Sequence, residues 1–373
     1  MERIENNKVL VSGASIAGMC TAWWLNKIGY RVTVVELAGS PRTSGGAVDF
    51  IGPTIDIAKR MGLFERFKSH RLSVDRIEYK NTDDITEGTI VLNDGQSEPG
   101  EDIEIERDKF VDVMFSDLKD NVEFLFNDSV TGLEETDDSV KVSFKSGDIR
   151  DFDLVIGCDG SHSGVRKIWF GPEKDYAHFL EAYFSISIVE KLLVPQRTMQ
   201  MYSVPYKSVM LNSYNNKTDI IFTFVSAEEI PYDYRDIAQH QHIIKENFEG
   251  QGWRIQELFE EVDKSGNFYF DKFCQIKMPS WSKGRVALVG DAAYCASPAA
   301  GQGGSLSMLG AAGIADALMK YQGNYSLAFQ EYEQILRPHI EEVQAMAEQN
   351  VKENFMLKTE EEIYIRNTEA KGF

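Results

Sequence analysis

Hydrophobic residues along this chain form three kinds of pattern, and each kind predicts a different element. Uninterrupted apolar runs predict strands buried on both faces of a sheet, from Val9 onward and at 154–158 and 285–290. Apolar residues at helical spacing predict helices at 54–67, 237–248, 254–262 and 305–318. Alternating apolar and polar positions predict half-buried strands at 183–189, 197–204, 209–214 and 219–225.

The order of these elements indicates two structural parts. The segment 9–36 has the order strand, glycine turn, helix, strand, which is a βαβ unit. The alternating strands of 176–226 instead predict a mostly antiparallel sheet, and the run at 285–290 then returns to the first part. From Ser326 to about Lys358 we expect a helix, which Pro338 should kink or split.

Composition narrows the class of protein. With 373 residues and 43% apolar content, the chain can bury a large core. A formal net charge of −20 argues against nucleic acid or an anionic membrane as a partner, because both attract clustered Lys and Arg. The four cysteines include no C-x-x-C pair, and no apolar run has the length of a signal peptide or a membrane span. We therefore expect a cytoplasmic protein without disulfides or a metal site.

The glycine turn of the first βαβ unit carries candidate chemistry. The fingerprint G-x-G-x-x-G is present as Gly13-Ala14-Ser15-Ile16-Ala17-Gly18, with Ser15 in place of the middle glycine. Such a turn directs the N–H groups and the positive dipole end of the next helix at a pyrophosphate. Glu36 follows at about the twenty-residue spacing that places an acid near a ribose. A nicotinamide-binding unit, or only a tight βα turn, has the same pattern.

Two later stretches repeat the arrangement of a buried strand that ends in glycine and aspartate. The first runs from Asp153 through Asp159-Gly160 to Arg166. The second passes through Gly290-Asp291 and Pro298 to Gly301-Gln302-Gly303-Gly304, where a helix of small residues begins. Backbone geometry alone favours Gly, Asp and Ser at such turns, but three matching turns in this order are hard to obtain by chance.

Together the three stretches resemble the group A flavoprotein monooxygenases, the aromatic hydroxylases similar to para-hydroxybenzoate hydroxylase. The resemblance covers Val9 to Leu318. The loop 42–49, the loop after Pro298 and the helical tail are most similar to the tetracycline-inactivating monooxygenases. The resemblance implies an α/β fold: a Rossmann-like FAD-binding domain, an inserted, mostly antiparallel β-sheet substrate domain and a C-terminal helix.

The resemblance also implies domain boundaries. We expect the FAD-binding domain at 1–73, 105–175 and 272–325, and the substrate domain at 74–104 and 176–271. The C-terminal helical segment would then cover 326–373.

Roles for individual residues follow from the same resemblance. The turn from Gly13 to Gly18 would hold the FAD pyrophosphate, Glu36 the adenosine ribose and Asp291 the ribityl hydroxyls. The loop from Pro298 to Gly304 would face the flavin pyrimidine edge. The further residues expected to bind the cofactor are Arg42, Gly46, Asp49, Arg107, Asp159 and Gly160. Arg166 is expected to brace the Asp159 motif.

Two departures from the family pattern concern Ser15 and Tyr294. Ser15 either crowds the pyrophosphate or donates a hydrogen bond to it. Tyr294 stands where many relatives have histidine, and we assign it no catalytic role. The six histidines of the chain show no spacing typical of metal ligands. His240 and His242 are two residues apart on an expected helix, so their side chains should point in different directions.

The activity implied is that of an NADPH-consuming monooxygenase. In the family, reduced FAD reacts with O2 to a C4a-hydroperoxide, which gives one oxygen atom to an aromatic or polycyclic substrate; here the substrate would be a tetracycline. The cofactor carries this chemistry, so no catalytic side chain is assigned. We expect a monomer and a small-molecule substrate. Gln200, Met210 and Phe222 are candidate substrate contacts, although the apolar residues of these strands would equally fill a core.

Three other functions fit parts of the sequence. A hydroxylase of a simple phenol or polyketide would share every motif. A flavin-binding protein without catalytic activity would share them as well. An NAD(P)-dependent dehydrogenase needs only the first βαβ unit and leaves Asp159-Gly160 and Gly290-Asp291 unexplained.

Overall fold

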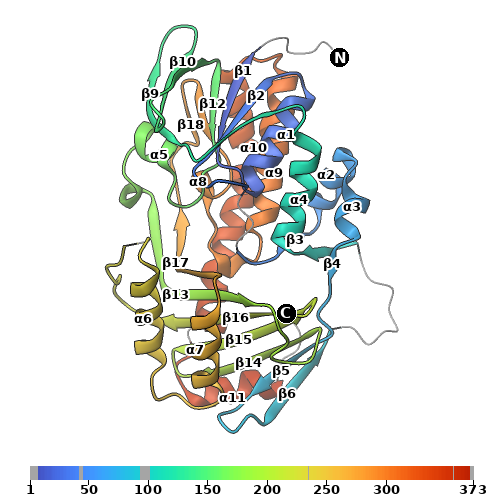
Figure 1. The fold of residues 1–373 in the computed structure, drawn as a ribbon, viewed down its shortest axis with the longest axis vertical. Coiled ribbons are helices and arrows are strands. Elements are labelled where there is room, and N and C mark those ends of the chain that lie inside the picture. The colour runs from blue at the N-terminus through green and yellow to red at the C-terminus, as the bar shows by residue number, and fades with distance from the viewer. Residues whose placement is uncertain (1–6, 42–44, 93–100, 234, 356, 370–373) are drawn as a thin grey trace. The chain divides into compact units, whose positions relative to one another are not determined.

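The computed structural model describes residues 7–41, 45–92, 101–233, 235–355 and 357–369, and these form two compact units (Figure 1). Unit 1 comprises Met1–Arg71, Glu101–His178 and Cys274–Ala347. Unit 2 comprises Leu72–Gly100, Phe179–Phe273 and Glu348–Phe373. The C-terminal helical segment, which the sequence predicts to be one segment at 326–373, is thus divided between the two units.

Unit 1 is built on a six-stranded sheet of order β18-β19-β12-β1-β2-β8. Its strands are Ser282–Lys283, Val286–Leu288, Leu154–Gly157, Lys8–Ser12, Arg31–Glu36 and Glu123–Phe126, in the same order. All neighbours pair in parallel except β18 with β19. Val9, Leu10 and Val11 of β1 are fully buried, as expected of a central strand covered on both faces.

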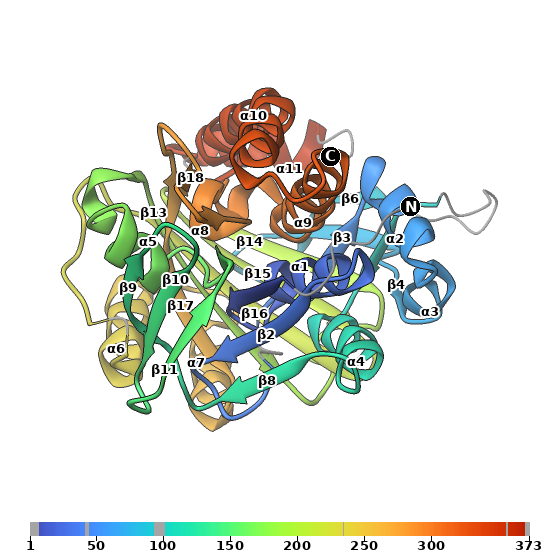
Figure 2. The same ribbon diagram turned by 90° about the horizontal axis from the view of Figure 1, so that it is seen from above.

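The helices of unit 1 pack around this sheet (Figure 2). Helix α1 (Ile16–Lys27) contacts both α4 (Arg107–Leu118) and α9 (Gly303–Lys320). Ten of its 12 residues are buried, so the helix is covered on almost every side. Besides α10, which is described below, the other helical elements in the described part of unit 1 are α2 (Pro53–Met61), α3 (Phe64–Lys68), α5 (Gly164–Trp169), η1 (Glu173–Asp175), α8 (Asp291–Tyr294) and η2 (Pro298–Ala300).

Two small sheets complete unit 1. Strands β9 (Val130–Glu135), β10 (Val140–Phe144) and β11 (Ile149–Phe152) form an antiparallel meander, whose last turn contains Gly147. The other sheet has the order β3-β7-β4, with strands Val48–Phe50, Ile103–Ile105 and Arg71–Leu72.

Unit 2 contains a seven-stranded sheet of order β17-β13-β16-β15-β14-β5-β6. Its strands are Phe268–Ile276, Ala177–Val189, Lys217–Val225, Lys207–Tyr214, Thr198–Val204, Arg76–Lys80 and Thr86–Val91, in the same order. The strands from β13 to β16 pair antiparallel, as predicted from the alternation, whereas β14 pairs with β5 in parallel.

One face of this sheet is covered by α6 (Ile237–Phe248) and α7 (Ile255–Lys264), which lie side by side in Figure 1. Strand residues such as Leu211, Ile220 and Phe224 join residues of both helices in one buried cluster. We call this side the helix-covered face. At the edge of the sheet, α11 (Glu360–Glu369) packs on β6 so closely that a Cβ atom on Gly88 would lie 1.8 Å from the carbonyl oxygen of Asn367.

Helix α10 (Tyr325–Asn350) corrects one expectation, since it runs without a break through Pro338 and continues into the π-helical turn η3 (Val351–Phe355). Contacts on both sides of the proline hold it in place. Tyr332 donates to the carbonyl oxygen of Leu288 at 3.1 Å, and Gln344 donates to that of Cys295 at 3.1 Å. These tertiary contacts outweigh the local cost of the proline, so the helix is not split.

Candidate functional site

The turn between β1 and α1 can be built only with glycine at two positions. Gly13 has a φ of +105°, and a Cβ atom there would lie 2.5 Å from the carbonyl oxygen of Cys158. A Cβ atom on Gly18 would lie 1.8 Å from the carbonyl oxygen of Gly13. The first and third glycines of the fingerprint therefore bring the turn, the helix and strand β12 into direct backbone contact.

The N-terminus of α1 is open to a ligand. Ser15 is the N-cap residue, and no side chain makes a capping hydrogen bond there. The first turn contains no acidic residue, and Ile16 and Ala17 occupy its first two positions. Uncapped N–H groups and the positive end of a 12-residue helix dipole form a site for a phosphate group.

Glu36 lies directly beside this turn. One carboxylate oxygen accepts from the backbone N–H of Ala14 at 2.7 Å, and the other from that of Ala38 at 2.9 Å. These two bonds fix the acid at the end of β2, next to the glycine turn, where a ribose hydroxyl can donate to it.

The Asp159-Gly160 turn follows β12. The Asp159 carboxylate accepts from the backbone N–H of Val165 at 3.0 Å and from the hydroxyl of Ser163. Burial raises the pKa of Asp159, while these hydrogen bonds oppose the rise. Gly160 has a φ of +82°, a backbone conformation that glycine adopts with less strain than any other residue. Asp159 thus stabilises the start of α5.

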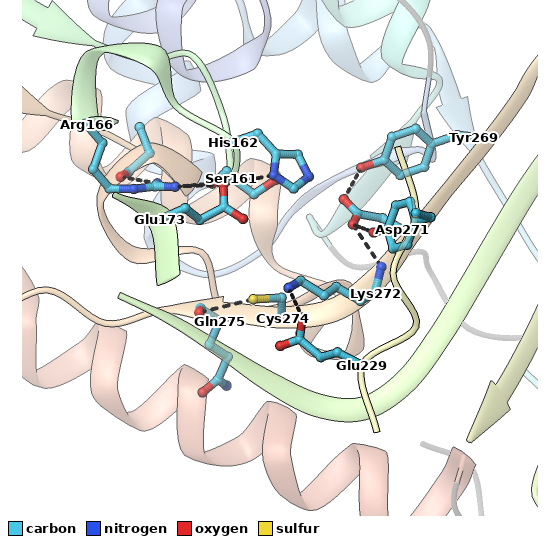
Figure 3. Close-up of polar contacts among 12 residues, drawn as sticks. Ser161, His162, Arg166, Glu173, Glu229, Tyr269, Asp271, Lys272, Cys274 and Gln275 are labelled. Atoms are coloured by element: carbon cyan, nitrogen blue, oxygen red, sulfur yellow. Dashed lines mark hydrogen bonds and ion pairs between the residues drawn. The ribbon is translucent and has the colours of Figure 1, made fainter. Parts of the chain in front are cut away.

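Arg166 connects this turn with the third motif. Its guanidinium is fully buried and donates to the carbonyl oxygens of Ser161 and Ala292, the latter at 2.9 Å. Glu173 lies 3.4 Å from the same side chain and also contacts His162 (Figure 3). Burial lowers the pKa of Arg166, and the carboxylates of Glu173 and Asp159 oppose this. Arg166 therefore braces the motif, as predicted.

The third motif brings the N-termini of two helices together. Gly290 has a φ of +70°, and a Cβ atom there would lie 2.9 Å from the Cβ of Ala17 and 3.0 Å from the hydroxyl of Ser307. Ala17 belongs to α1 and Ser307 to α9, so both helices begin beside this glycine. Asp291 is the first residue of α8.

The loop from Pro298 to Gly304 leads into the start of α9. Gly301 has a φ of +66°, and Gln302 is the N-cap residue of α9 without a capping side-chain bond. A Cβ atom on Gly304 would lie 2.6 Å from the side chain of Val48, so this position admits only glycine without rearrangement. An 18-residue helix with an uncapped N-terminus can stabilise negative charge on a bound ring.

Strand β3 borders the start of α9, and the start of α4 contacts the loop that precedes β3. The backbone oxygen of Asp49 accepts from the hydroxyl of Ser305 at 2.8 Å. Arg107 donates from Nε to the carbonyl oxygen of Gly46 at 3.3 Å. Burial raises the pKa of the Asp49 carboxyl to about 6. Arg42 lies outside the described residues.

Apart from Arg42, the cofactor residues predicted from the sequence lie in unit 1, most of them at the three strand–helix turns and the others before or in β3 and at the start of α4. A dinucleotide fits the arrangement, because two helices present N-termini without capping side-chain bonds and because Gly160, Gly301 and Gly303 leave open space beside the turns. A cavity of about 680 Å³ lies elsewhere, at the amino ends of β1 and β2, and is lined by Lys8, Tyr30 and Arg31 among others. None of the predicted cofactor residues lines that cavity.

The three candidate substrate residues of unit 2 do not share one face of the sheet. Phe222 is fully buried in the cluster of the helix-covered face, where its ring contacts Phe248 and Phe259. It is a core residue. Gln200 is paired in register with Leu211 of that cluster, and its amide donates to Glu78 at 2.9 Å. Met210 is paired with Met201 and Ile221 on the opposite face and is half-buried.

Residues of that opposite face were missed in the sequence. Asn212 is 8% exposed, and its side-chain oxygen has no hydrogen-bond partner among the described residues. A buried carboxamide oxygen without a partner calls for an explanation, and a bound ligand supplies one. The signal in the sequence was a polar residue inside an alternating strand, at the register of an apolar face.

Unit 2 also contains a buried carboxylate on strand β17. The Asp271 carboxylate accepts from the hydroxyls of Tyr232 and Tyr269 at 2.9 and 2.7 Å, and Lys272 pairs with Glu229 nearby (Figure 3). Burial, together with the Asp271 charge, raises the pKa of Tyr232 well above its usual range. Tyr232 therefore remains a neutral donor, and the cluster stabilises edge strand β17.

Metal-binding clusters and membrane-spanning helices are both absent from the described part of the chain. No group of three or more His, Cys, Asp or Glu residues there is arranged to hold a metal ion. Likewise, none of the helices in the described ranges is both long and apolar enough to cross a membrane.

Comparison with known proteins shows the family of this chain. Residues 6–347 match the family model of the FAD binding domain. A flavin-dependent monooxygenase of Legionella longbeachae is 33% identical over 362 residues, which cover 95% of this chain and 91% of the relative.

Crystal structures of two tetracycline destructases have the same fold. The alignment with Tet(51) has a TM-score of 0.85 and 34% sequence identity, and it covers 97% of this chain and 95% of the Tet(51) chain. Tet(55) gives a TM-score of 0.85 at 31% identity and covers 98% of each chain. The predicted fold class is thereby confirmed, and the chain belongs to the FAD binding domain family as a flavin-dependent monooxygenase.

Proposed function

We propose that this monooxygenase consumes NADPH and O2 and inserts one oxygen atom into a planar polycyclic substrate, of which a tetracycline is the first candidate. The sequence similarity to two tetracycline destructases, over almost the full length of the chain, supports this substrate class. Bound FAD would supply the redox chemistry and the activation of oxygen, while side chains bind and orient the substrate and exclude water.

The observation that carries the substrate class is the composition of one sheet face in unit 2. Opposite the helix-covered face, neighbouring strands place Phe184, Met199, Met201, Met210 and Ile221, which we call the methionine face. All except Met201 are only half-buried, although each is large and apolar. Methionine adapts its shape and makes favourable contacts with aromatic rings, so this surface suits a broad planar ligand.

Asn212 would supply polar recognition within this apolar surface. It is paired in register with Met199 on one side and with Asp219 on the other. The Asp219 carboxylate is already engaged by the hydroxyl of Tyr214 at 2.6 Å. The carboxamide of Asn212 is therefore the polar group of this row that is best placed to bind a substrate hydroxyl or carbonyl.

A panel of tetracyclines and simple phenols tests the proposal. We expect tetracyclines to stimulate NADPH oxidation by the purified yellow holoenzyme and to give a product heavier by about 16 mass units, the mass of one oxygen atom. Stimulation by phenols alone would reject the polycyclic substrate and leave the monooxygenase family unaffected. Flavin binding without stimulation by any compound would favour a non-catalytic flavin-binding protein.

A pair of variants tests the role of the sheet face. Asn212→Leu should raise the KM for the accepted substrate about tenfold, as the loss of one hydrogen bond to a desolvated ligand predicts. Val91→Thr, at an exposed edge position of β6, is the matched control and should leave KM unchanged. An unchanged KM in Asn212→Leu would exclude this residue from the substrate site.

A further inference from the structure

The segment that leads to the flavin loop contains a residue in an unfavourable backbone conformation. Ser297, directly before Pro298, has a φ of +83° although it is not glycine. It is also buried, and its hydroxyl accepts from the backbone N–H of Ala299. A non-glycine residue keeps such a conformation only when its surroundings hold it there.

Two buried glutamines hold the residues before Ser297. Gln344 of α10 donates from Nε2 to the carbonyl oxygens of Cys295 at 3.1 Å and Ile276 at 2.9 Å. Gln275 donates from Nε2 to the carbonyl oxygens of Ala296 at 3.3 Å and Gln344 at 2.7 Å. Each carbonyl between α8 and Ser297 is thus fixed by a side-chain amide. We call Gln275 and Gln344 the glutamine clamp.

The orientation of the clamp is determined by its donors. Gln275 is fully buried at the end of β17, beside Cys274 in Figure 3, and Gln344 is 5% exposed. Both Nε2 groups face two carbonyl oxygens, so the reverse orientation of either amide would set oxygen against oxygen. The remaining oxygen of Gln275 is buried without a partner among the described residues. The Gln275 side-chain oxygen is therefore left without a partner within the described ranges, in the one orientation that lets the amide nitrogen donate to both carbonyl oxygens.

The clamp lies close to the N-terminus of α9. From Ser297 the chain passes through η2 and Gly301 to Gly303, the first residue of α9. The direction in which that helix presents its N–H groups therefore depends on the conformation held at 295–297. A helix N-terminus stabilises negative charge only over a short distance, so a small displacement changes its effect on a reduced ring.

We propose that the glutamine clamp is a positioning device, which holds Ser297 in its unfavourable conformation and thereby sets the N-terminus of α9 against the flavin ring. The proposal depends on the family's FAD site and is independent of the substrate class. Loosening the clamp should weaken binding of reduced FAD more than binding of oxidised FAD, because only the reduced ring carries the added negative charge.

The test uses FAD-loaded enzyme with Gln344→Met or Gln275→Met, which keep the side-chain length and remove the donors. A tenfold loss in the binding of reduced relative to oxidised flavin lowers the midpoint potential by about 30 mV for a two-electron couple. We expect a shift of about this size in both variants. Gln349→Met is the matched control, since Gln349 is an exposed residue of the same helix and should leave the potential unchanged.

Glycine at position 297 provides a second test. Ser297→Gly accepts a positive φ without support, so in the Gln344→Met background it should restore the potential and the retention of flavin. A midpoint potential equal to that of the wild type in both clamp variants would overturn the proposal. If Gln344→Met fails to fold, a Gln344→Met/Ser297→Gly protein that still lacks flavin would overturn it too.

Discussion

At the scale of single residues, the site depends on where side chains are missing. Gly13, Gly18 and Gly290 each lie where a Cβ atom would come within 3 Å of another part of the site. Ser15, which stands in place of the middle glycine of the fingerprint, is the N-cap residue of α1, a position that serine commonly occupies. Its presence is thus compatible with the turn, whereas alanine at Gly13 or Gly18 is not.

Gly18→Ala is expected to weaken FAD binding by at least about tenfold, because the added carbon would lie 1.8 Å from the carbonyl oxygen of Gly13 and displace the turn. Titration of the apoprotein with FAD, followed by quenching of flavin fluorescence, measures the change. Gly266→Ala is the control, since its added carbon would have no neighbouring atom within 4 Å. Equal affinities for Gly18→Ala and the wild type would contradict the assigned role of the turn.

Asp49 should make the stability of the FAD-free protein depend on pH. Burial raises its folded pKa to about 6, above the unfolded value of about 3.9. The folded protein thus favours the protonated Asp49. The contribution of this group to the free energy of unfolding is fully present below the unfolded pKa, and it is lost as the pH rises through about 6. Asp49→Asn removes this loss.

We therefore expect Asp49→Asn to gain stability relative to the wild type as the pH rises from about 4 to about 6, the range between the two pKa values. Urea denaturation of both apoproteins at each pH measures the difference. A difference that stays constant over this range would show that the carboxyl is not perturbed by burial.

At the scale of elements, Tyr294 explains how α8, α9 and α10 fit together. Its hydroxyl is hydrogen-bonded with that of Tyr332 of α10 at 3.0 Å, and its ring packs on Trp281. Burial raises the pKa of Tyr294, which keeps the hydroxyl neutral. Space for this hydroxyl exists only because Gly310 of α9 has no side chain. Tyr294 is therefore a packing residue, which agrees with leaving it without a catalytic role.

Gly310→Ala should destabilise the fold by about 2 kcal/mol, the usual cost of overpacking, because the added carbon would lie 1.8 Å from the hydroxyl oxygen of Tyr294. Tyr294→Phe removes that oxygen. The double variant should therefore be about 1 kcal/mol more stable than the sum of the single changes predicts. Denaturant unfolding of the four proteins measures the coupling, and purely additive effects would contradict this contact.

At the scale of the whole molecule, the cofactor residues belong to unit 1 and the methionine face to unit 2. FAD should therefore protect the segments around 13–18, 36 and 290–304 from hydrogen exchange. Riboflavin lacks both the pyrophosphate and the adenosine half, and it should protect only the flavin loop near 298–304. Hydrogen-exchange mass spectrometry with each ligand separates the two patterns. Protection of 13–18 by riboflavin would place the pyrophosphate elsewhere.

Much of this architecture was predictable because local patterns carried it. Buried strands such as β12 have continuous apolar sequences, and the strands from β13 to β16 alternate, so the period of each pattern identified its sheet. The glycine turns were predictable for the same reason, since steric exclusion of a side chain leaves glycine in the sequence. The sequence left open whether Pro338 kinks or splits the helix, and the split does not occur because contacts on both sides of the proline, which are not local, hold α10 together.

By itself, the sequence determined the family and the division into a βαβ-containing part and a mostly antiparallel sheet, and it predicted the residues of the cofactor turns. These features follow from local backbone constraints. Only the tertiary structure decided which face each strand residue occupies. It placed Phe222 in the core, Met210 on the methionine face and Asn212 in a buried position without a partner for its side-chain oxygen among the described residues. The alternation shows that neighbouring residues point to opposite sides, but which side a helix covers depends on contacts between segments far apart in the chain.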